Sequence, residues 1–141
     1  MKFNVNQQDL QQALSYCQGV IEKRSTLPIL SNVLLDAQNL QLTITATDLD
    51  LIFVHKIKNI EIVEEGKTTT TSSIMYDIVR KFTSGKKINL SLSNNNKLQL
   101  ESEKSIFNLN CISHSEFPLT DENFNDYEFS INCKSLCKLI N

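Results

Sequence analysis

Two carboxylates stand two residues apart in Asp48-Leu49-Asp50. In an extended strand both side chains would project from one face, where they could hold Mg²⁺ for phosphoryl chemistry. The pair lies between two strand patterns, however, and Asp favours turns there because its side chain bonds its own backbone. No G-x-x-x-x-G-K-[ST] or G-x-G-x-x-G phosphate-binding pattern accompanies it. We therefore predict a turn, with metal-dependent catalysis as the alternative.

The other residues that could do chemistry are isolated from one another. The four cysteines are Cys17, Cys111, Cys133 and Cys137, and the two histidines are His55 and His114. Cys133 and Cys137 could share a metal on one helix face, but no second ligand pair has suitable spacing. Neither histidine has a Ser or Cys partner at a recognisable spacing, so nothing supports a nucleophilic triad. The sequence predicts no catalytic residue, metal site or cofactor, which favours a binding or scaffold protein.

The charge distribution limits how the chain could bind nucleic acid. A formal net charge of −2 excludes a strongly basic field over the whole protein, so phosphates would have to meet local positive patches. Three such patches, each near the predicted end of a helix, are Lys23-Arg24, Arg80-Lys81 and Lys86-Lys87. Cations at helix C-termini also offset the helix dipole, so this pattern alone leaves both interpretations open.

The sequence lacks the features of an exported or membrane-spanning chain. It begins with an alternating strand pattern rather than a basic stretch and an apolar run, and no apolar run approaches the ~20 residues that span a bilayer. We expect a cytoplasmic protein with free thiols and no membrane partner.

Periodicity predicts an α+β domain of two similar halves, each a helix on an antiparallel sheet. The first helix follows Asn6 as its N-cap, with Asp9 in its first turn and apolar residues from Leu10 at helical spacing. The second helix begins at Ser72 or Ser73 and ends at Gly85. Predicted strands cover 33–35, 40–45, 51–56, 59–63, 88–93, 97–102 and 106–112, with a polar edge strand at 68–71. The order is helix–strands, then helix–strands again, which gives two similar halves within one domain.

A segment near the end of the chain repeats its beginning. Phe3-Asn4-Val5-Asn6 and the helical pattern after it return as Phe129-Ser130-Ile131-Asn132, followed by Leu136, Leu139 and Ile140. The polar stretch 113–127 between them suits a linker. We predict one domain over residues 1–125, and over 126–141 the opening strand and helix of a truncated second domain, with its tail poorly ordered or docked on a neighbour.

Several motifs together resemble a known family. The segments MKFNV, STLPILSNVLL, LTITATDLDL, YDIVR and EFPL, in this order, resemble the N-terminal domain of the bacterial DNA polymerase III β subunit, the sliding clamp. The resemblance covers essentially the whole chain. It implies a DNA-clamp fold in which the helices of each domain lie on one face and line the hole of a ring. Three similar domains form a protomer, and two protomers close head to tail around duplex DNA. The implied function is non-catalytic: the ring confers processivity on the polymerase by topological tethering.

The resemblance also implies which residues meet DNA. Arg24 matches a DNA-contacting arginine of the family, Lys23 precedes it, and Arg80 and Lys81 on the second helix could add positive potential. Where the family often has an arginine that contacts DNA and then a lysine, this chain has Ser73-Ile74, so that contact is not carried over. The first helix carries glutamines rather than lysines, so we expect a mild field inside the ring.

The family's protomer contact aligns with residues 104–109, which in the family meet the third domain of the partner. The residues of interest are Lys104, Ile106, Phe107 and Leu109. Ile106 and Phe107 point to opposite faces of a strand, so at most one is core, and the sequence leaves open which. The pocket for polymerase and clamp-loader peptides belongs to family domains absent here. The alternative function is a monomeric clamp-domain fragment acting as an interaction module without DNA tethering, and oligomeric state separates the two.

Overall fold

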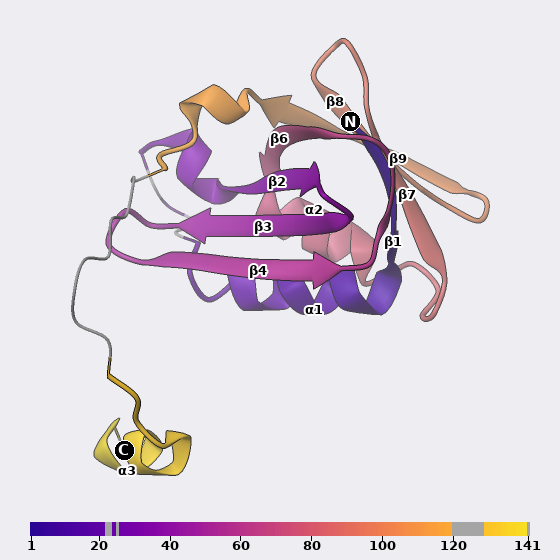
Figure 1. Ribbon diagram of the computed structural model, residues 1–141. Helices are drawn as coiled ribbons and strands as arrows, with labels where there is room; N and C mark the ends of the chain where they lie inside the picture. The colour runs from indigo at the N-terminus through magenta and orange to yellow at the C-terminus, as the bar shows by residue number, and fades with distance from the viewer. Residues whose placement is uncertain (22–23, 25, 120–128, 141) are drawn as a thin grey trace.

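The structure, a computed structural model, describes residues 1–21, 24, 26–119 and 129–140. Its elements follow the predicted order (Figure 1). They are β1 (Lys2–Asn6), α1 (Gln7–Cys17), β2 (Asn32–Gln38), β3 (Gln41–Thr47), β4 (Ile52–Lys58), β5 (Glu61–Glu64), β6 (Gly66–Thr71), α2 (Ser72–Val79), β7 (Lys87–Leu92), β8 (Lys97–Ser102), β9 (Ser105–Ile112) and α3 (Cys133–Ile140). Short 3-10 turns lie at Pro28–Ser31 and His114–Glu116.

The strands form one antiparallel sheet in the order β4-β3-β2-β6-β9-β8-β7-β1-β5. The first half runs from β1 to β5 and the second from β6 to β9. The first strand of each half pairs with a strand of the other half: β1 pairs with β7, and β6 pairs with β2. The prediction that residues 68–71 form an edge strand is therefore wrong. Thr68, Thr69 and Thr70 are buried in the middle of the sheet, where the hydroxyl groups of Thr69 and Thr70 donate to carbonyl oxygens of β9.

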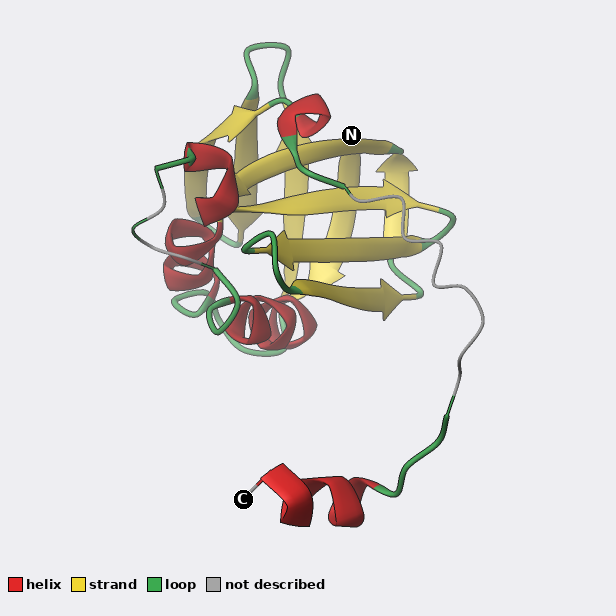
Figure 2. Ribbon diagram, turned by 90° about the vertical axis from the view of Figure 1, so that its left-hand side faces the viewer, coloured by secondary structure: helices red, strands yellow, loops and turns green. Residues whose placement is uncertain are grey.

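Helices α1 and α2 lie on the same side of the sheet, which confirms the predicted α+β class (Figure 2). Their apolar residues join strand residues in one core that includes Phe3, Leu10, Leu14, Met75 and Leu100. Asn6 caps α1 as predicted, since its Oδ1 accepts from the backbone N–H of Gln8 at 2.9 Å. The helix pattern of the sequence is thus realised by burial of one face of each helix against the strands.

Two glutamines fix how α1 and α2 run past each other. Nε2 of the buried Gln7, at the start of α1, donates to the Val79 carbonyl at 2.9 Å, at the end of α2. At the other end, Nε2 of Gln18 donates to Oγ of Ser72 at 2.8 Å. The helices are therefore antiparallel neighbours. At each end of the pair, the C-terminus of one helix lies beside the N-terminus of the other.

The C-terminal segment has its helix but not its predicted strand. Residues 129–132 form no strand, and all residues of α3 are exposed (Figure 1). The predicted boundary between 125 and 126 lies outside the described residues. Within the described part of the chain, no helix is long and apolar enough to span a membrane.

Candidate functional site

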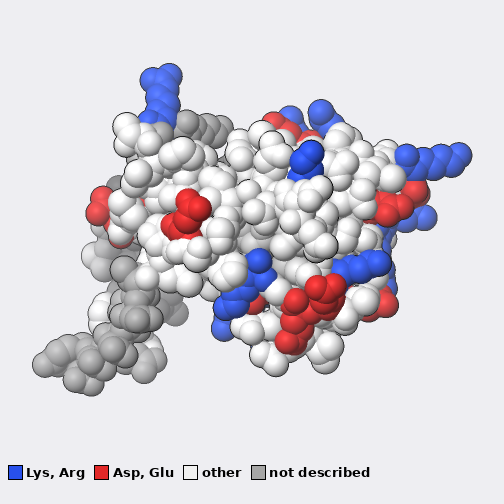
Figure 3. Space-filling view, turned by 90° about the horizontal axis from the view of Figure 1, so that it is seen from above, with Lys and Arg blue, Asp and Glu red and all other residues white. Residues whose placement is uncertain are grey.

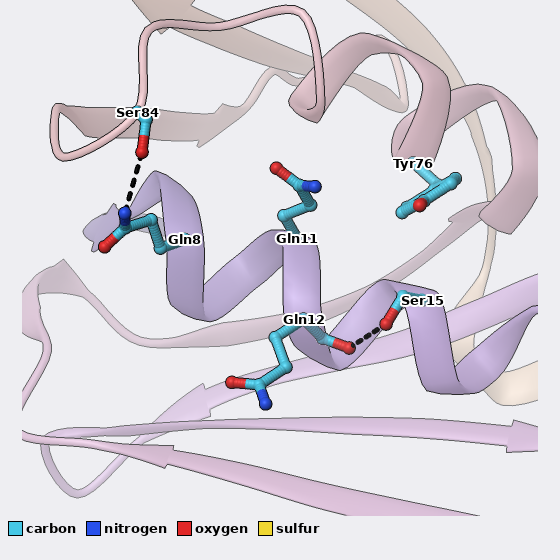
Figure 4. A pocket seen from close by; sticks show the side chains of 6 residues that line it. All are labelled: Gln8, Gln11, Gln12, Ser15, Tyr76 and Ser84. Carbon is cyan, nitrogen blue, oxygen red and sulfur yellow. Dashed lines mark hydrogen bonds between the residues drawn. The ribbon is translucent and has the colours of Figure 1, made fainter.

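A groove of about 470 Å³ runs between α1 and α2 on the helix side of the domain (Figure 4). It is lined by Gln8, Gln11, Gln12, Ser15, Tyr76 and Ser84. Its side chains bind their neighbours: Gln8 Nε2 donates to Ser84 Oγ at 2.7 Å, and Gln12 Nε2 donates to the Tyr16 hydroxyl at 3.0 Å. No lining residue carries a charge at neutral pH, so the groove offers hydrogen bonds without a strong field.

The cations predicted to meet DNA lie at opposite ends of this helix pair. Arg24 is exposed in the segment that follows α1, whereas Arg80 and Lys81 are exposed directly after α2. Because the helices are antiparallel, the C-terminal ends of α1 and α2 are separated by about the length of α2, roughly 12 Å for eight residues. The sequence predicted both patches but not this separation. Lys23 lies outside the described residues.

Arg80 is held by its own helix. Its guanidinium Nη2 lies 3.1 Å from Oδ1 of Asp77, with about half of each side chain exposed, and its Cζ lies 5.8 Å from the centroid of the Tyr76 ring. An exposed ion pair of this kind contributes about 0–1 kcal/mol, so a phosphate could replace Asp77 at little cost. Sequence reasoning missed this partner, although the spacing of three residues on a helix indicates it.

The outer edge of β9 is the second candidate surface. One side of β9 pairs with β8, while on the other side only Cys111 and Ile112 pair with β6. Among the described residues, the stretch 105–110 therefore has no strand on that side. The Asn110 carbonyl on this side accepts from the Thr70 hydroxyl. The ladder groups before it are a template for a further strand.

The structure shows which side chains of β9 point toward the helices and which point to the opposite face of the sheet. The Phe107 ring lies 5.7 Å from the Phe82 ring in an edge-to-face contact, so it points toward the helix side and remains 37% exposed. Ile106 points to the opposite face and is 56% exposed. Leu109 is 8% exposed and packs within the core, on the same face of β9 as Phe107. Lys104 is exposed in the turn before β9.

Residues 1–121 match a family model described as the DNA polymerase III beta subunit, N-terminal domain. The chain belongs to this family. The beta sliding clamp of Caulobacter vibrioides is 32% identical over 142 residues, covering 99% of this chain and 38% of that protein. The beta sliding clamp of Pseudomonas aeruginosa is 31% identical over 140 residues, with the same two coverages. The chain thus spans about 38% of the length of these curated relatives.

Solved structures of the family have the same fold. A crystal structure of the DNA polymerase III subunit beta from Pseudomonas aeruginosa aligns with a TM-score of 0.94 at 31% identity, over 99% of this chain and 38% of that one. The Caulobacter crescentus pol III beta structure aligns with a TM-score of 0.93 at 32% identity, over 99% of this chain and 37% of that one. The resemblance recognised in the sequence motifs is therefore confirmed.

In this clamp-family domain the Asp48 carboxylate has a structural role at the β3–β4 turn. Oδ1 of Asp48 accepts from the backbone N–H groups of Asp50 and Leu51 at 3.0 and 2.6 Å, which confirms the predicted turn. These bonds hold Leu49 at a φ of +83°, a conformation that costs a non-glycine residue about 1–3 kcal/mol. Among the described residues, no three His, Cys, Asp or Glu side chains are grouped to hold a metal ion.

The cysteines differ in their environments. Burial on the core side of α1 raises the pKa of the Cys17 thiol to about 12, because the thiolate would lose its hydration. Cys133 and Cys137 are exposed on α3. All four thiols are free.

Proposed function

We propose that this chain supplies a domain of a sliding clamp, a ring that encircles duplex DNA and tethers the replicative polymerase. The ring is non-catalytic and acts in the cytoplasm. Its second protomer closes it head to tail, and polymerase and clamp loader bind through domains outside this chain. The observation that carries the proposal is the helix side of the domain, where a neutral groove separates two cationic ends.

This arrangement suits sliding. Each phosphate contact by an Arg or Lys releases counterions and gives affinity without reading sequence. Few such contacts, spread along the duplex rather than concentrated, keep each one weak and easily exchanged. Between them, Gln8, Gln11 and Gln12 offer amide groups that can bind phosphates or water without adding charge. The net charge of −2 supports a ring held by its topology rather than by a basic surface. The face of the domain opposite α1, shown in Figure 3, likewise carries both acidic and basic side chains.

Retention on circular DNA tests the proposal. The protein, as it is expressed from its own gene, is loaded onto nicked circular DNA with its clamp loader and passed through a gel-filtration column. We expect it to remain with the circle and to leave once a restriction enzyme cuts the DNA. Equal retention on circular and linear DNA would contradict topological tethering, and a strictly monomeric protein would favour the interaction module.

The contributing cations can be tested separately. We expect Arg24→Ala and Arg80→Ala each to reduce by about one the slope of log affinity for duplex DNA against log salt concentration, because each removes about one phosphate contact. Lys97→Ala, which removes an exposed cation from β8, is the matched control and should leave the slope unchanged. A slope that falls equally for all three variants would mean that DNA meets no particular face of this domain.

A further inference from the structure

Arg80 differs from the other candidate DNA-binding cations because it has an acidic partner. Among the described residues, no acidic side chain pairs with Arg24 or Lys81. Nη2 of Arg80 lies 3.1 Å from Oδ1 of Asp77, and its Cζ lies 5.8 Å from the ring centroid of Tyr76, which lines the groove (Figure 4). The side chains of Arg80 and Asp77 are 52% and 55% exposed, so a phosphate can reach the guanidinium while the pair is formed.

The stability of α2 does not account for the position of Asp77. This residue lies in the last turn of the helix, which ends at Val79. The helix dipole places partial negative charge at that end, so it disfavours a carboxylate there and favours a cation such as Arg80. The ion pair between residues three apart on the helix surface offsets this cost by a similarly small amount. The clearest consequence of Asp77 is therefore its effect on Arg80.

The carboxylate and a DNA phosphate are alternative acceptors for the same guanidinium. Both are oxyanions that match the planar fork of N–H donors of an arginine. When Arg80 binds a phosphate, Asp77 remains three residues away on the same helix, within reach of the guanidinium. Release of the phosphate then does not leave Arg80 unpaired, because Asp77 takes its place. The carboxylate thus makes the contact easier to break without removing the cation.

We propose that Asp77 is an internal substitute for a DNA phosphate, which hastens the release of Arg80 and so speeds sliding along the duplex. This inference rests on the proposed ring and gives Asp77 a positioning role in it. As the duplex moves past this end of the helix pair, Arg80 alternates between one phosphate, Asp77 and the next phosphate. Because exposed charges are screened by salt, the effect of Asp77 decreases as ionic strength rises.

The test tracks single fluorescent rings on stretched duplex DNA. It uses the protein as it is expressed from its own gene, loaded by its clamp loader. Asp77→Asn removes the charge of a half-exposed side chain and nearly keeps its shape, so the fold should be retained, which circular dichroism checks. The measured quantity is the diffusion coefficient along DNA, at about 0.1 M and about 0.5 M NaCl, since screening increases between these concentrations.

Glu101→Gln is the matched control. It also removes one exposed carboxylate, but from β8, where Leu98 and Leu100 are buried in the core and Glu101 points to the opposite face. A third protein combines Asp77→Asn with Arg80→Ala. This double variant separates an effect that acts through the guanidinium from the general repulsion between a carboxylate and DNA.

We expect Asp77→Asn to lower the diffusion coefficient by roughly two- to fivefold at the lower salt concentration, as for the loss of one exposed ion pair that competes with phosphate. The factor should be smaller at the higher concentration. Glu101→Gln should leave the coefficient unchanged, and the double variant should slide as Arg80→Ala does, because it has no guanidinium to release.

Two results would overturn this inference and leave the ring in place. An unchanged coefficient for Asp77→Asn would mean that the carboxylate does not compete with phosphate. An equal slowing with and without Arg80 would mean that Asp77 acts only as a general negative charge. The ring itself would be overturned by a different result: a wild-type protein that leaves circular DNA as fast as it leaves cut DNA.

Discussion

The segments 3–14 and 129–140 have the same sequence pattern, and their helices begin in the same way. Oδ1 of Asn6 accepts from the backbone N–H of Gln8 at 2.9 Å, and Oδ1 of Asn132 accepts from that of Lys134 at 2.9 Å. In each segment the helix starts at the residue after the asparagine. A cap and a run of helix formers thus specify a helix locally, because a helix satisfies its backbone groups within itself.

The strands before these helices show the opposite. Phe3 is fully buried in β1, which pairs with β7 on one side and β5 on the other. Phe129 is 83% exposed, and its segment forms no strand. A strand must find its hydrogen-bond partners elsewhere in the chain, so the same residues remain irregular where no sheet accepts them. The comparison separates what the local sequence determines from what the tertiary neighbours supply.

The largest expected difference between the two segments is in how much an equivalent leucine contributes to the free energy of unfolding. Leu10 is fully buried and Leu136 is 40% exposed, although they occupy the same helical position. Leu10→Ala should lower the free energy of unfolding by about 2–5 kcal/mol, because it leaves a cavity in the core. Leu136→Ala is the matched control and should change it by less than about 0.5 kcal/mol. Urea denaturation followed by circular dichroism measures both, and comparable losses would mean that α3 packs on the domain.

The same distinction explains how far the sequence predicted the molecule. The caps, the helix faces and the β7–β9 spans follow from local pattern, and so does the turn at Asp48. The exchange of β1 and β6 between the halves does not, because alternation shows that a strand has two faces and not which strand lies beside it. Polar Thr68–Thr71 suggested an edge, yet the hydroxyls of Thr69, Thr70 and Thr71 form hydrogen bonds to β9 and to Asn32 in the centre of the sheet.

The sequence predicted the individual residues of the candidate site but not their positions relative to one another. Residue types and motifs pointed to Arg24, Arg80 and Lys81. Their placement at opposite ends of the helix pair depends on the antiparallel packing that Gln7 and Gln18 fix. Likewise, strand alternation placed Phe107 and Ile106 on opposite faces, but only the contact with Phe82 shows which face meets the helices.

The paired caps give a smaller effect. Asn6→Ala should lower the free energy of unfolding by about 1 kcal/mol, because the N–H of Gln8 loses its acceptor, and Asn6→Asp should restore it. Asn132→Ala should leave global unfolding unchanged and instead reduce the helix population of α3, since an isolated helix of eight residues is marginal. Carbon chemical shifts of residues 133–140 report that population. If Asn132→Ala lowered the free energy of global unfolding as much as Asn6→Ala does, α3 would be packed into the domain as firmly as α1.

The smallest effect concerns the carboxylates that hold β1 and have no counterpart around residues 129–132. The hydrogen bond from Asn4, followed by the hydrogen bond and charge of Lys87, lowers the pKa of Glu61 below its usual 4.5. A lowered folded-state pKa means that Glu61 stabilises the fold above the unfolded-state value and loses this contribution as pH falls through the folded-state value.

Glu61→Gln should therefore slightly reduce the free energy of unfolding at pH 7, where the wild-type carboxylate is ionised, and the difference should vanish in acid below the folded-state pKa. Glu101→Gln, an exposed carboxylate on β8, is the matched control. Urea denaturation repeated from neutral pH down through the carboxylate range measures both variants. A difference for Glu61→Gln that persists at low pH would mean that the shape of the side chain, rather than its charge, holds β1 in the sheet.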